Sequence, residues 1–567
     1  MMIGILLAAA LSLDGSWAFR FEEGKTLETA SGRTFEATDS MSVPGCYDMM
    51  PKWLCKRGTG LYRRTFVLER PVENAWLLVE GMGLRAKFAV DGREIGSSVY
   101  PWQELEIPTG PLAAGEHEIF AALDNTLDPA KQKLALDYYD FYLYGGFYHG
   151  VSLVFDNRKL RVRTRDYKTG RVEIEAVNFK AADFEATLVF DGKHEVKATF
   201  KGGRTTVNVP DFKLWSPESP AMHTVEARVR RGEGAPETGA VRARFGIREV
   251  KAEKRRIWLN GEPIYLKGAN RHEAHPAFGA ATPEAQMVED LQLMKSINCN
   301  FVRGCHYQQS RRFLDYCDEM GMLVWEESLG WNNSAKQMAD PEYFRQQVDQ
   351  TKAMVKASFN HPSVIIYAFQ NENASQTKEG KKMNDALIDA IRGEDSGRLV
   401  TFACSHCKDD ISNEKTDLVA YNTYPGWFDN KGVGDNENLN RIVDDKVREI
   451  TDRFRKLYPE KPIIVSEMGV CGVYGAHDPA AAQWTEEFQC DYVGAAIRAV
   501  FANPEMCGFT IWHFADARSY HRSGGALRGK PFAQNLAGVY DGYRRAKKLA
   551  ETVREHFAQK AVTEGGK

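Results

Sequence analysis

Long apolar runs are missing from this chain of 567 residues, and no stretch approaches the about 20 apolar residues that a membrane-spanning helix needs. Concentrated positive charge is missing too, because 74 Lys and Arg stand against 77 Asp and Glu, a formal net charge of −3. Nucleic acids and anionic membranes are bound by dense basic patches. The sequence therefore predicts neither a nucleic acid nor a membrane as a partner.

Paired cysteines are almost absent. The 10 cysteines are scattered singly except for Cys404 and Cys407, and no second pair follows at the spacing of metal ligands. We therefore expect free thiols, no metal and a reducing compartment. Residues 3–11 are apolar but lack a preceding positive segment, so there is no clear signal peptide. The expected location is cytoplasmic or periplasmic in a bacterium, and a signal remnant within residues 1–11 stays open.

The first 250 residues or so predict an all-β region. Short alternating or aromatic-rich runs, such as 62–67 and 118–123, are separated by Gly- and Pro-containing turns. A break near residues 156–159 precedes a second set of short strands, with a hairpin signal at Asp191-Gly192. We expect one β-sandwich followed by a small immunoglobulin-like sandwich.

Beyond about residue 250, short apolar runs alternate with helical patterns, which is typical of βα units. One helical segment, 311–320, stops at Gly321. Eight parallel strands with intervening helices in about 300 residues indicate a (β/α)8 barrel. The eight predicted strands are 264–267, 300–303, 323–325, 364–368, 399–403, 418–421, 463–466 and 508–512.

The active site of such a barrel lies at the C-terminal ends of its strands. Polar or aromatic side chains follow nearly every predicted strand, and carboxylates and Trp or Tyr faces are what glycoside chemistry uses. The residues at these ends include Asn270, His272, His306, Glu326, Glu327, Asn371, Glu372, Asn422, Tyr424, Trp427, Glu467, Trp512 and Asp516.

Two glutamates stand out among them. Glu372 follows the fourth predicted strand and Glu467 ends the seventh. A single glutamate after a strand is most often a helix N-terminal charge. Retaining glycosidases, however, need two carboxylates about 5–5.5 Å apart, and inward-pointing side chains over the barrel mouth could meet at that distance. We interpret the pair as catalytic, with Asn371 placed to hydrogen-bond a substrate hydroxyl.

Six segments spread along the chain are distinctive: Leu13-Asp14-Gly15-Ser16-Trp17, Gly60-Leu61-Tyr62-Arg63-Arg64, Leu214-Trp215-Ser216-Pro217, Lys267-Gly268-Ala269-Asn270-Arg271-His272, Asn371-Glu372 and Ile464-Val465-Ser466-Glu467. They give the chain, over nearly its whole length, a resemblance to glycoside hydrolase family 2, the family of β-galactosidases, β-glucuronidases and β-mannosidases. It implies a multidomain fold: an N-terminal jelly-roll-like β-sandwich (1–157), an immunoglobulin-like β-sandwich (158–250) and a C-terminal (β/α)8 TIM barrel (251–567).

The resemblance also implies a retaining mechanism in two displacements. Glu467 is the implied nucleophile and Glu372 the implied acid/base, so the pKa of Glu372 should be raised while Glu467 is ionised. This chemistry needs no cofactor and no metal. The expected partner is a β-linked glycoside or oligosaccharide, cleaved from its terminus, and relatives commonly form homo-oligomers, which we expect here.

Several matches resemble the β-glucuronidase branch of the family. The substrate-binding residues that this implies are Asp140, His306, Tyr424, Trp427, Trp512 and Asn535, in addition to Asn371 beside Glu372. One departure concerns the Asn-x-Lys pair with which that branch holds the sugar carboxylate, because the nearest match, Asn535-Leu536-Ala537, lacks the lysine. Arg528 could hold the carboxylate from another direction, and Arg522 and Lys530 lie in the same segment.

Our hypothesis is that the substrate is a β-D-uronide, either a galacturonide or a glucuronide. Two alternatives stay open: a β-galactosidase-type enzyme for a neutral sugar, and a catalytically inactive carbohydrate-binding protein. Exposed loop cations would explain Arg528 and its neighbours equally well.

Overall fold

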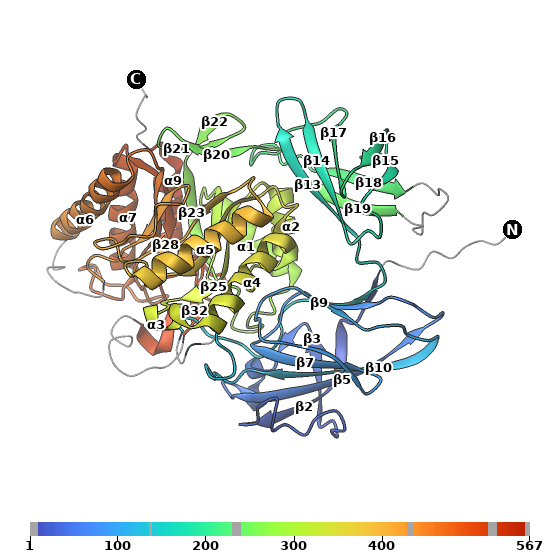
Figure 1. Ribbon diagram of the computed structural model, residues 1–567. Coiled ribbons are helices and arrows are strands. Elements are labelled where there is room, and N and C mark those ends of the chain that lie inside the picture. The colour runs from blue at the N-terminus through green and yellow to red at the C-terminus, as the bar shows by residue number, and fades with distance from the viewer. Residues whose placement is uncertain are drawn as a thin grey trace.

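The computed structural model describes residues 10–134, 136, 139–229, 240–427, 436–519 and 530–561, which form two β-sandwiches and a barrel (Figure 1). In Figure 1 the first sandwich is blue, the second is cyan to green, and the barrel runs from yellow-green to red. The predicted fold class is confirmed. The predicted boundary at 157 falls between strands β12 (Val151–Val154) and β13 (Lys159–Asp166), and the boundary at 250 falls where β20 (Val250–Glu253) begins.

The first sandwich packs a six-stranded sheet, in the order β3-β2-β5-β10-β7-β8, on a four-stranded sheet, β1-β12-β6-β9. Alternate residues of its strands point inward, so Trp17 and Phe19 are buried and pack against Tyr62. The strands are β1 (Ala10–Ser12), β2 (Gly15–Glu23), β3 (Asp39–Val43), β5 (Gly58–Leu68), β6 (Trp76–Val79), β7 (Arg85–Val90), β8 (Arg93–Ser98), β9 (Leu105–Pro108), β10 (Gly115–Asp124) and β12. A short pair joins β4 (Gly45–Cys46) to β11 (Gly146–Phe147).

The second sandwich pairs a three-stranded sheet, β13-β14-β17, with a four-stranded sheet, β16-β15-β18-β19. The predicted hairpin at Asp191-Gly192 joins β15 to β16, and both turn residues have positive φ, 50° and 68°. This is the geometry that Asp-Gly turns favour. The remaining strands are β14 (Arg171–Val177), β15 (Phe184–Phe190), β16 (His194–Phe200), β17 (Arg204–Asn208), β18 (His223–Val229) and β19 (Ala240–Phe245).

The barrel is one parallel sheet in the order β27-β26-β25-β24-β23-β31-β30-β29-β28. Its two end strands are halves of the fifth predicted strand, because β27 pairs with β26 and β28 pairs with β29. The sheet therefore closes on itself, and all eight predicted strands are confirmed. They are β23 (Leu266–Arg271), β24 (Phe301–Gly304), β25 (Leu323–Trp331), β26 (Val364–Asn371), β27 (Leu399–Thr401) with β28 (Ala403–Cys404), β29 (Val419–Asn422), β30 (Ile463–Met468) and β31 (Met506–Ile511).

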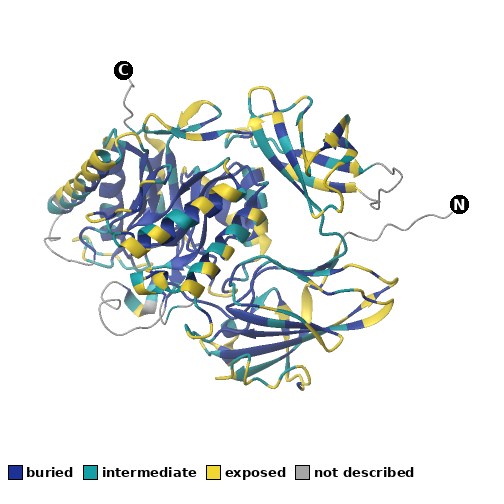
Figure 2. Cartoon of the chain, in the orientation of Figure 1, coloured by how far each residue is buried: buried dark blue, intermediate teal, exposed yellow. Residues whose placement is uncertain are grey.

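Helices surround the barrel, and Figure 2 shows that their outer faces are exposed while the strands inside are buried. Helix α2 ends at Gly321 with φ 69°, as predicted. No helix in the described part of the chain is long and apolar enough to cross a membrane. The α-helices are α1 (Glu284–Ser296), α2 (Arg311–Met320), α3 (Ala335–Ala339), α4 (Pro341–Ser358), α5 (Lys378–Glu394), α6 (Asn436–Leu457), α7 (Glu486–Ala502) and α9 (Leu549–Ala558). A small sheet, β20-β21-β22, with β21 (Arg256–Leu259) and β22 (Glu262–Ile264), precedes β23.

The first sandwich docks against the C-terminal ends of the barrel strands. Trp102 stacks on Tyr307, which follows β24, with ring centroids 4.0 Å apart. His149 forms a buried ion pair with Glu273, which follows β23, at 2.8 Å. These contacts bring the segment 139–144 of the first sandwich to the mouth of the barrel.

Candidate active site

The two predicted carboxylates both lie at the mouth of the barrel. Glu467 is the penultimate residue of β30 and is buried, whereas Glu372 directly follows β26 and is half-buried. Asn422, at the end of β29, links the two strand ends. Its amide donates to Glu372 Oε1 at 2.8 Å and its Oδ1 accepts from the Ser466 hydroxyl at 2.7 Å.

Glu467 is held on both oxygens. Its Oε1 accepts a hydrogen bond from the Arg303 guanidinium at 2.5 Å, and its Oε2 accepts one from the Tyr424 hydroxyl at 2.5 Å. His306 Nε2 lies 3.8 Å from Oε1. Donors on both oxygens stabilise the ionised form of a carboxylate and fix its orientation.

Glu372 has a different environment. Burial and the neighbouring Glu467 carboxylate raise the pKa of Glu372 to about 7, and the Asn422 amide only partly opposes them. Its backbone has φ 54°, and its N–H donates to Ala403 O at 2.9 Å on the adjacent strand β28. A glutamate with φ in the left-handed region is uncommon and marks a position that the surrounding structure imposes.

Arg303, the third residue of β24, is the centre of the hydrogen-bond network and was not predicted as a site residue. Its guanidinium donates to Glu467, Glu327, Asn270 Oδ1 at 2.9 Å and Asn371 Oδ1 at 2.9 Å. Burial disfavours its charge, but Glu327 and Glu467 outweigh this effect and raise the pKa of Arg303. The sequence offered one signal, an arginine at the end of a predicted apolar barrel strand. A charged side chain that such a strand buries needs partners.

The tandem glutamates after strand β25 have opposite surroundings. Glu327 accepts from Arg303 at 2.9 Å and from Trp325 Nε1 at 2.9 Å, so it supports the site through Arg303. Glu326 points to the other face of the strand. Burial raises the pKa of Glu326 to about 7. The Glu326 side chain packs between the strand and the surrounding helices.

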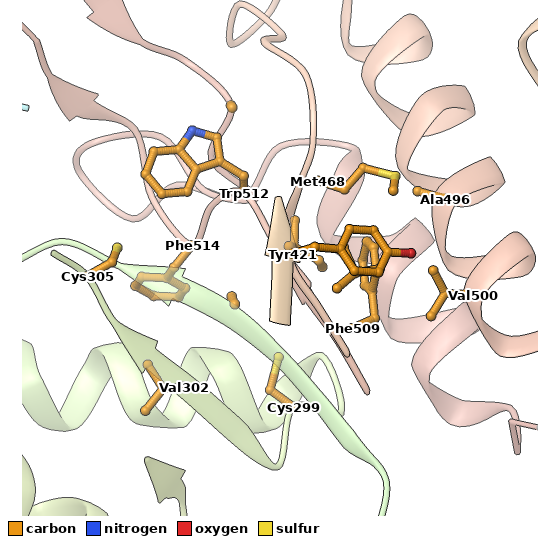
Figure 3. Close-up of a cluster of buried hydrophobic side chains, with 14 of the residues drawn as sticks. Cys299, Val302, Cys305, Tyr421, Met468, Ala496, Val500, Phe509, Trp512 and Phe514 are labelled. Carbon is orange, nitrogen blue, oxygen red and sulfur yellow. The ribbon is translucent and has the colours of Figure 1, made fainter. Parts of the chain in front are cut away.

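Aromatic rings line the same mouth. His306 stacks on Trp512, with ring centroids 5.5 Å apart and planes 11° apart. Tyr424 meets Trp427 edge to face at 5.3 Å. Figure 3 shows Trp512 at the margin of a buried apolar cluster that includes Phe514, Cys305 and Met468. The predicted residues His306, Tyr424, Trp427 and Trp512 are thus brought together around Glu467.

Asp140 reaches the mouth from the first sandwich. Its neighbour Phe141 packs on His306, with ring centroids 5.6 Å apart, and the Ser519 hydroxyl donates to Asp140 O at 2.9 Å. The Asp140 carboxylate forms an ion pair with Lys530 Nζ. Lys530 is buried, and this burial lowers its pKa to about 7. A buried lysine beside Asp140 could not be identified from the sequence, where Lys530 was one of several loop cations.

Only some of the other predicted residues of this region lie within the described residues. Asn535 lies in the short strand β33 (Gln534–Asn535), which pairs with β32 (Ala517–Arg518), and its Oδ1 accepts from Ala537 N at 3.4 Å. Arg522 and Arg528 lie outside the described residues.

Two clusters of side chains among the described residues have the composition to hold a metal ion. One is His272, Cys305 and His306, beside Glu467. The other is Asp315, Asp318 and His361, where Asp318 already accepts from His361 Nδ1 at 2.6 Å and from Ser363 N at 3.0 Å. Cys404 and Cys407 are free thiols, as predicted.

Family models match most of the chain. The model of the TIM barrel domain of glycosyl hydrolases family 2 matches residues 250–557, and a second model of the same family matches residues 156–248. The chain belongs to glycosyl hydrolase family 2. It is a glycoside hydrolase, and the predicted resemblance is confirmed.

Known members of family 2 resemble this chain closely in architecture. A β-glucuronidase of Streptococcus agalactiae is 27% identical over 413 residues, 69% of this chain and 67% of its own length. The crystal structure of a GH2 β-galacturonidase of Eisenbergiella tayi is 28% identical, with a TM-score of 0.86 and 98% of both chains covered. A β-glucuronidase of Ruminococcus gnavus has the same fold, with a TM-score of 0.86 at 22% identity and 97% coverage of both chains.

Proposed function

We propose that this family 2 hydrolase is a retaining exo-β-glycosidase whose substrate is a β-D-uronide. The observation that carries the proposal is the contrast between its two carboxylates. Glu467 accepts hydrogen bonds from Arg303 and Tyr424 on its two oxygens, while the pKa of Glu372 is raised to about 7. Pairs of carboxyl groups whose environments separate their protonation states serve as nucleophile and acid.

The proposed reaction has two steps. In the first, Glu467 attacks the anomeric carbon and the C–O bond to the leaving group breaks as Glu372 donates its proton to the leaving oxygen. In the second, Glu372 takes a proton from water, which attacks the glycosyl-enzyme and releases Glu467. Asn371 supports the positioning of the sugar, because its Oδ1 is held by Arg303 and Asn422 while its buried Nδ2 has no partner within the described segments.

The assignment to uronides rests on charge at the sugar subsite. A carboxylate in a buried site needs a cation, and Lys530 supplies one beside Asp140 although the Asn-x-Lys lysine is missing. The E. tayi relative is described both as a β-galacturonidase and as bound to galacturonate. We therefore propose that Lys530 helps to bind the C6 carboxylate, and that Arg528 is a second cation for it.

Azide rescue tests the two catalytic roles. Each of Glu372→Ala and Glu467→Ala should lose activity by a factor on the order of 10⁴ or more. With azide and an activated aryl glycoside, Glu372→Ala should form the β-glycosyl azide, because azide attacks the glycosyl-enzyme. Glu467→Ala should form the α-azide by direct attack. The opposite pairing of products would reverse the roles, and an inverted first product from the unaltered enzyme would contradict retention.

Substrate specificity is tested with p-nitrophenyl β-D-galacturonide, β-D-glucuronide and β-D-galactoside. We expect a higher kcat/KM on one or both uronides. Much faster cleavage of the galactoside would contradict the uronidase proposal and favour the neutral-sugar alternative, whereas no turnover on a broad panel of β-glycosides would favour an inactive carbohydrate-binding protein.

The role of Lys530 is tested on the same panel. Lys530→Met should lower kcat/KM on uronides by about 10²-fold relative to the galactoside, because a buried carboxylate loses its cation. Lys548→Met is the matched control, since Lys548 is an exposed lysine that is also paired with a carboxylate, Glu487, at 3.1 Å. Arg528→Ala should likewise lower uronide turnover selectively. Equal losses on both sugar classes would contradict these roles.

A further inference from the structure

The cluster of His272, Cys305 and His306 lies beside the carboxylate that we propose as nucleophile. One ligand atom from each of the three residues lies within 4.8 Å of the other two, and all three side chains are buried. The ligands of one tetrahedral Zn²⁺ lie about 3.3–3.8 Å apart, given Zn–N bonds of about 2.0 Å and Zn–S bonds of about 2.3 Å. Small side-chain adjustments would therefore bring all three onto one ion.

Both histidines are already oriented as metal ligands usually are. His306 Nδ1 lies 3.2 Å from Glu327 Oε1 and 3.3 Å from the Arg303 guanidinium, and His272 Nδ1 lies 3.2 Å from the Tyr307 hydroxyl. Metal-ligating histidines almost always use their second nitrogen in such a hydrogen bond, often to a carboxylate. With both Nδ1 atoms engaged, the Nε2 atoms remain to bind a cation.

A carboxylate lies beside the cluster, because Glu467 Oε1 is 3.8 Å from His306 Nε2, although Glu467 is outside the group whose ligand atoms all lie within 4.8 Å of one another. The balance of charge also suits a divalent ion. The Arg303 guanidinium carries one positive charge here, and Glu467 and Glu327 both bind it. A Cys305 thiolate adds a third negative charge, so a divalent cation brings this group close to neutrality.

We propose that Cys305, His272 and His306 form a binding site for a thiophilic divalent cation such as Zn²⁺, which captures Glu467 as its fourth ligand and inhibits the enzyme reversibly. Binding replaces the thiol proton: Cys–SH and M²⁺ give Cys–S–M⁺ and a free proton, with no change of oxidation state. The cation and the sugar compete for Glu467. Binding itself does not depend on the proposed function; the inhibition does, because it requires Glu467 to react.

Cobalt reports the thiolate directly. The test titrates the full-length enzyme with Co²⁺ under reducing conditions and records its near-ultraviolet absorption. We expect a thiolate-to-cobalt charge-transfer band that saturates at one ion per chain and disappears on adding Zn²⁺. Absence of the band from the unaltered enzyme would overturn the proposal, and this measurement requires no variant to fold.

Variants then locate the site. Cys305→Ser should abolish the band and weaken Zn²⁺ binding, measured by titration calorimetry, by at least about 10-fold. Cys299→Ser is the matched control, because Cys299 is also a buried thiol, but it precedes β24 whereas Cys305 follows it (Figure 3). We expect this variant to retain both the band and the affinity. Loss of the band in Cys299→Ser, or Zn²⁺ affinity unchanged in Cys305→Ser, would contradict the assignment.

Kinetics separate binding from its consequence. Zn²⁺ should raise KM with little effect on kcat, and EDTA should restore activity. Purely non-competitive inhibition would overturn the capture of Glu467. If the enzyme binds Co²⁺ through Cys305 and yet cleaves no glycoside on any panel, then the proposed function fails while the metal site stands.

Discussion

At the scale of single residues, the site depends on how two carboxyl groups are made different. Glu467 accepts hydrogen bonds on both oxygens, whereas the carboxyl of Glu372 is bound by one neutral amide and faces the Glu467 charge. The difference between the two carboxyl environments therefore has a physical cause in Arg303, Tyr424 and Asn422, which the sequence motifs alone do not reveal.

The pH dependence follows from Glu372. As the proposed general acid, Glu372 must be protonated in the first step, so kcat/KM should fall as pH rises above about 7, the value to which burial and Glu467 raise its pKa. The fall should be much weaker for a dinitrophenyl leaving group, which needs no proton. Measuring kcat/KM against pH for both substrates, and for Glu372→Gln, checks this. An unchanged alkaline fall in Glu372→Gln would assign it to another group.

Arg303 positions the carboxylates, and lysine cannot replace it, because one ammonium cannot reach all the side-chain partners that the guanidinium binds. We expect Arg303→Lys to lower kcat by about 10²-fold, since Glu467 loses its fixed orientation. Steady-state kinetics and thermal unfolding together check this. If kcat stays within twofold of the unaltered enzyme, Arg303 does not position the proposed nucleophile.

At the scale of elements, buried ion pairs join segments that hydrophobic packing brings together. Asp290 on helix α1 accepts from Arg271 at the end of β23 at 3.0 Å and from Arg544 in the C-terminal segment at 2.8 Å. Both arginines hold the pKa of Asp290 below its ordinary value, although burial opposes them. This network ties the first βα unit to the segment that follows the last barrel strand.

Asp290→Asn should lower the free energy of unfolding by about 3–5 kcal/mol, because it removes the anion that two buried guanidinium groups share. Denaturant unfolding measures the effect. Asp389→Asn serves as control, since Asp389 forms an exposed pair with Lys415 at 2.8 Å and should change stability by less than about 1 kcal/mol. A loss at Asp290 no larger than the control's would contradict this reading of the network.

At the scale of the whole molecule, the first sandwich completes the mouth of the barrel. The His149–Glu273 pair and the Trp102–Tyr307 stack hold it in place, and Asp140 then reaches Lys530. Burial disfavours both charges of the His149–Glu273 pair, but the attraction and the hydrogen bond between the two side chains outweigh it. The pKa of His149 is therefore raised and the pKa of Glu273 is lowered.

The coupling between these two residues should therefore depend on pH. His149 contributes stability that is fully present below its ordinary pKa of 6.5 and is lost as pH rises through its raised folded value. Glu273 contributes stability above its ordinary 4.5 that is lost as pH falls through its lowered value. A double-mutant cycle with His149→Asn and Glu273→Gln should give about 0.5–3 kcal/mol near pH 6 and less at alkaline pH. Coupling that grows with pH would contradict this.

The sequence by itself determined the domain order, the eight barrel strands and the position of Glu372 and Glu467 at two strand ends, because alternation, helical periodicity and local motifs are short-range signals. Homo-oligomer formation, also expected from the sequence, stays a prediction. Only the tertiary structure decided that Arg303 joins Glu327, Asn371 and Glu467, and that Lys530 lies against Asp140. Those contacts join different barrel strands, or join the barrel to a sandwich. The distances between these segments depend on how the sheet closes and how the domains dock, which no local sequence pattern encodes.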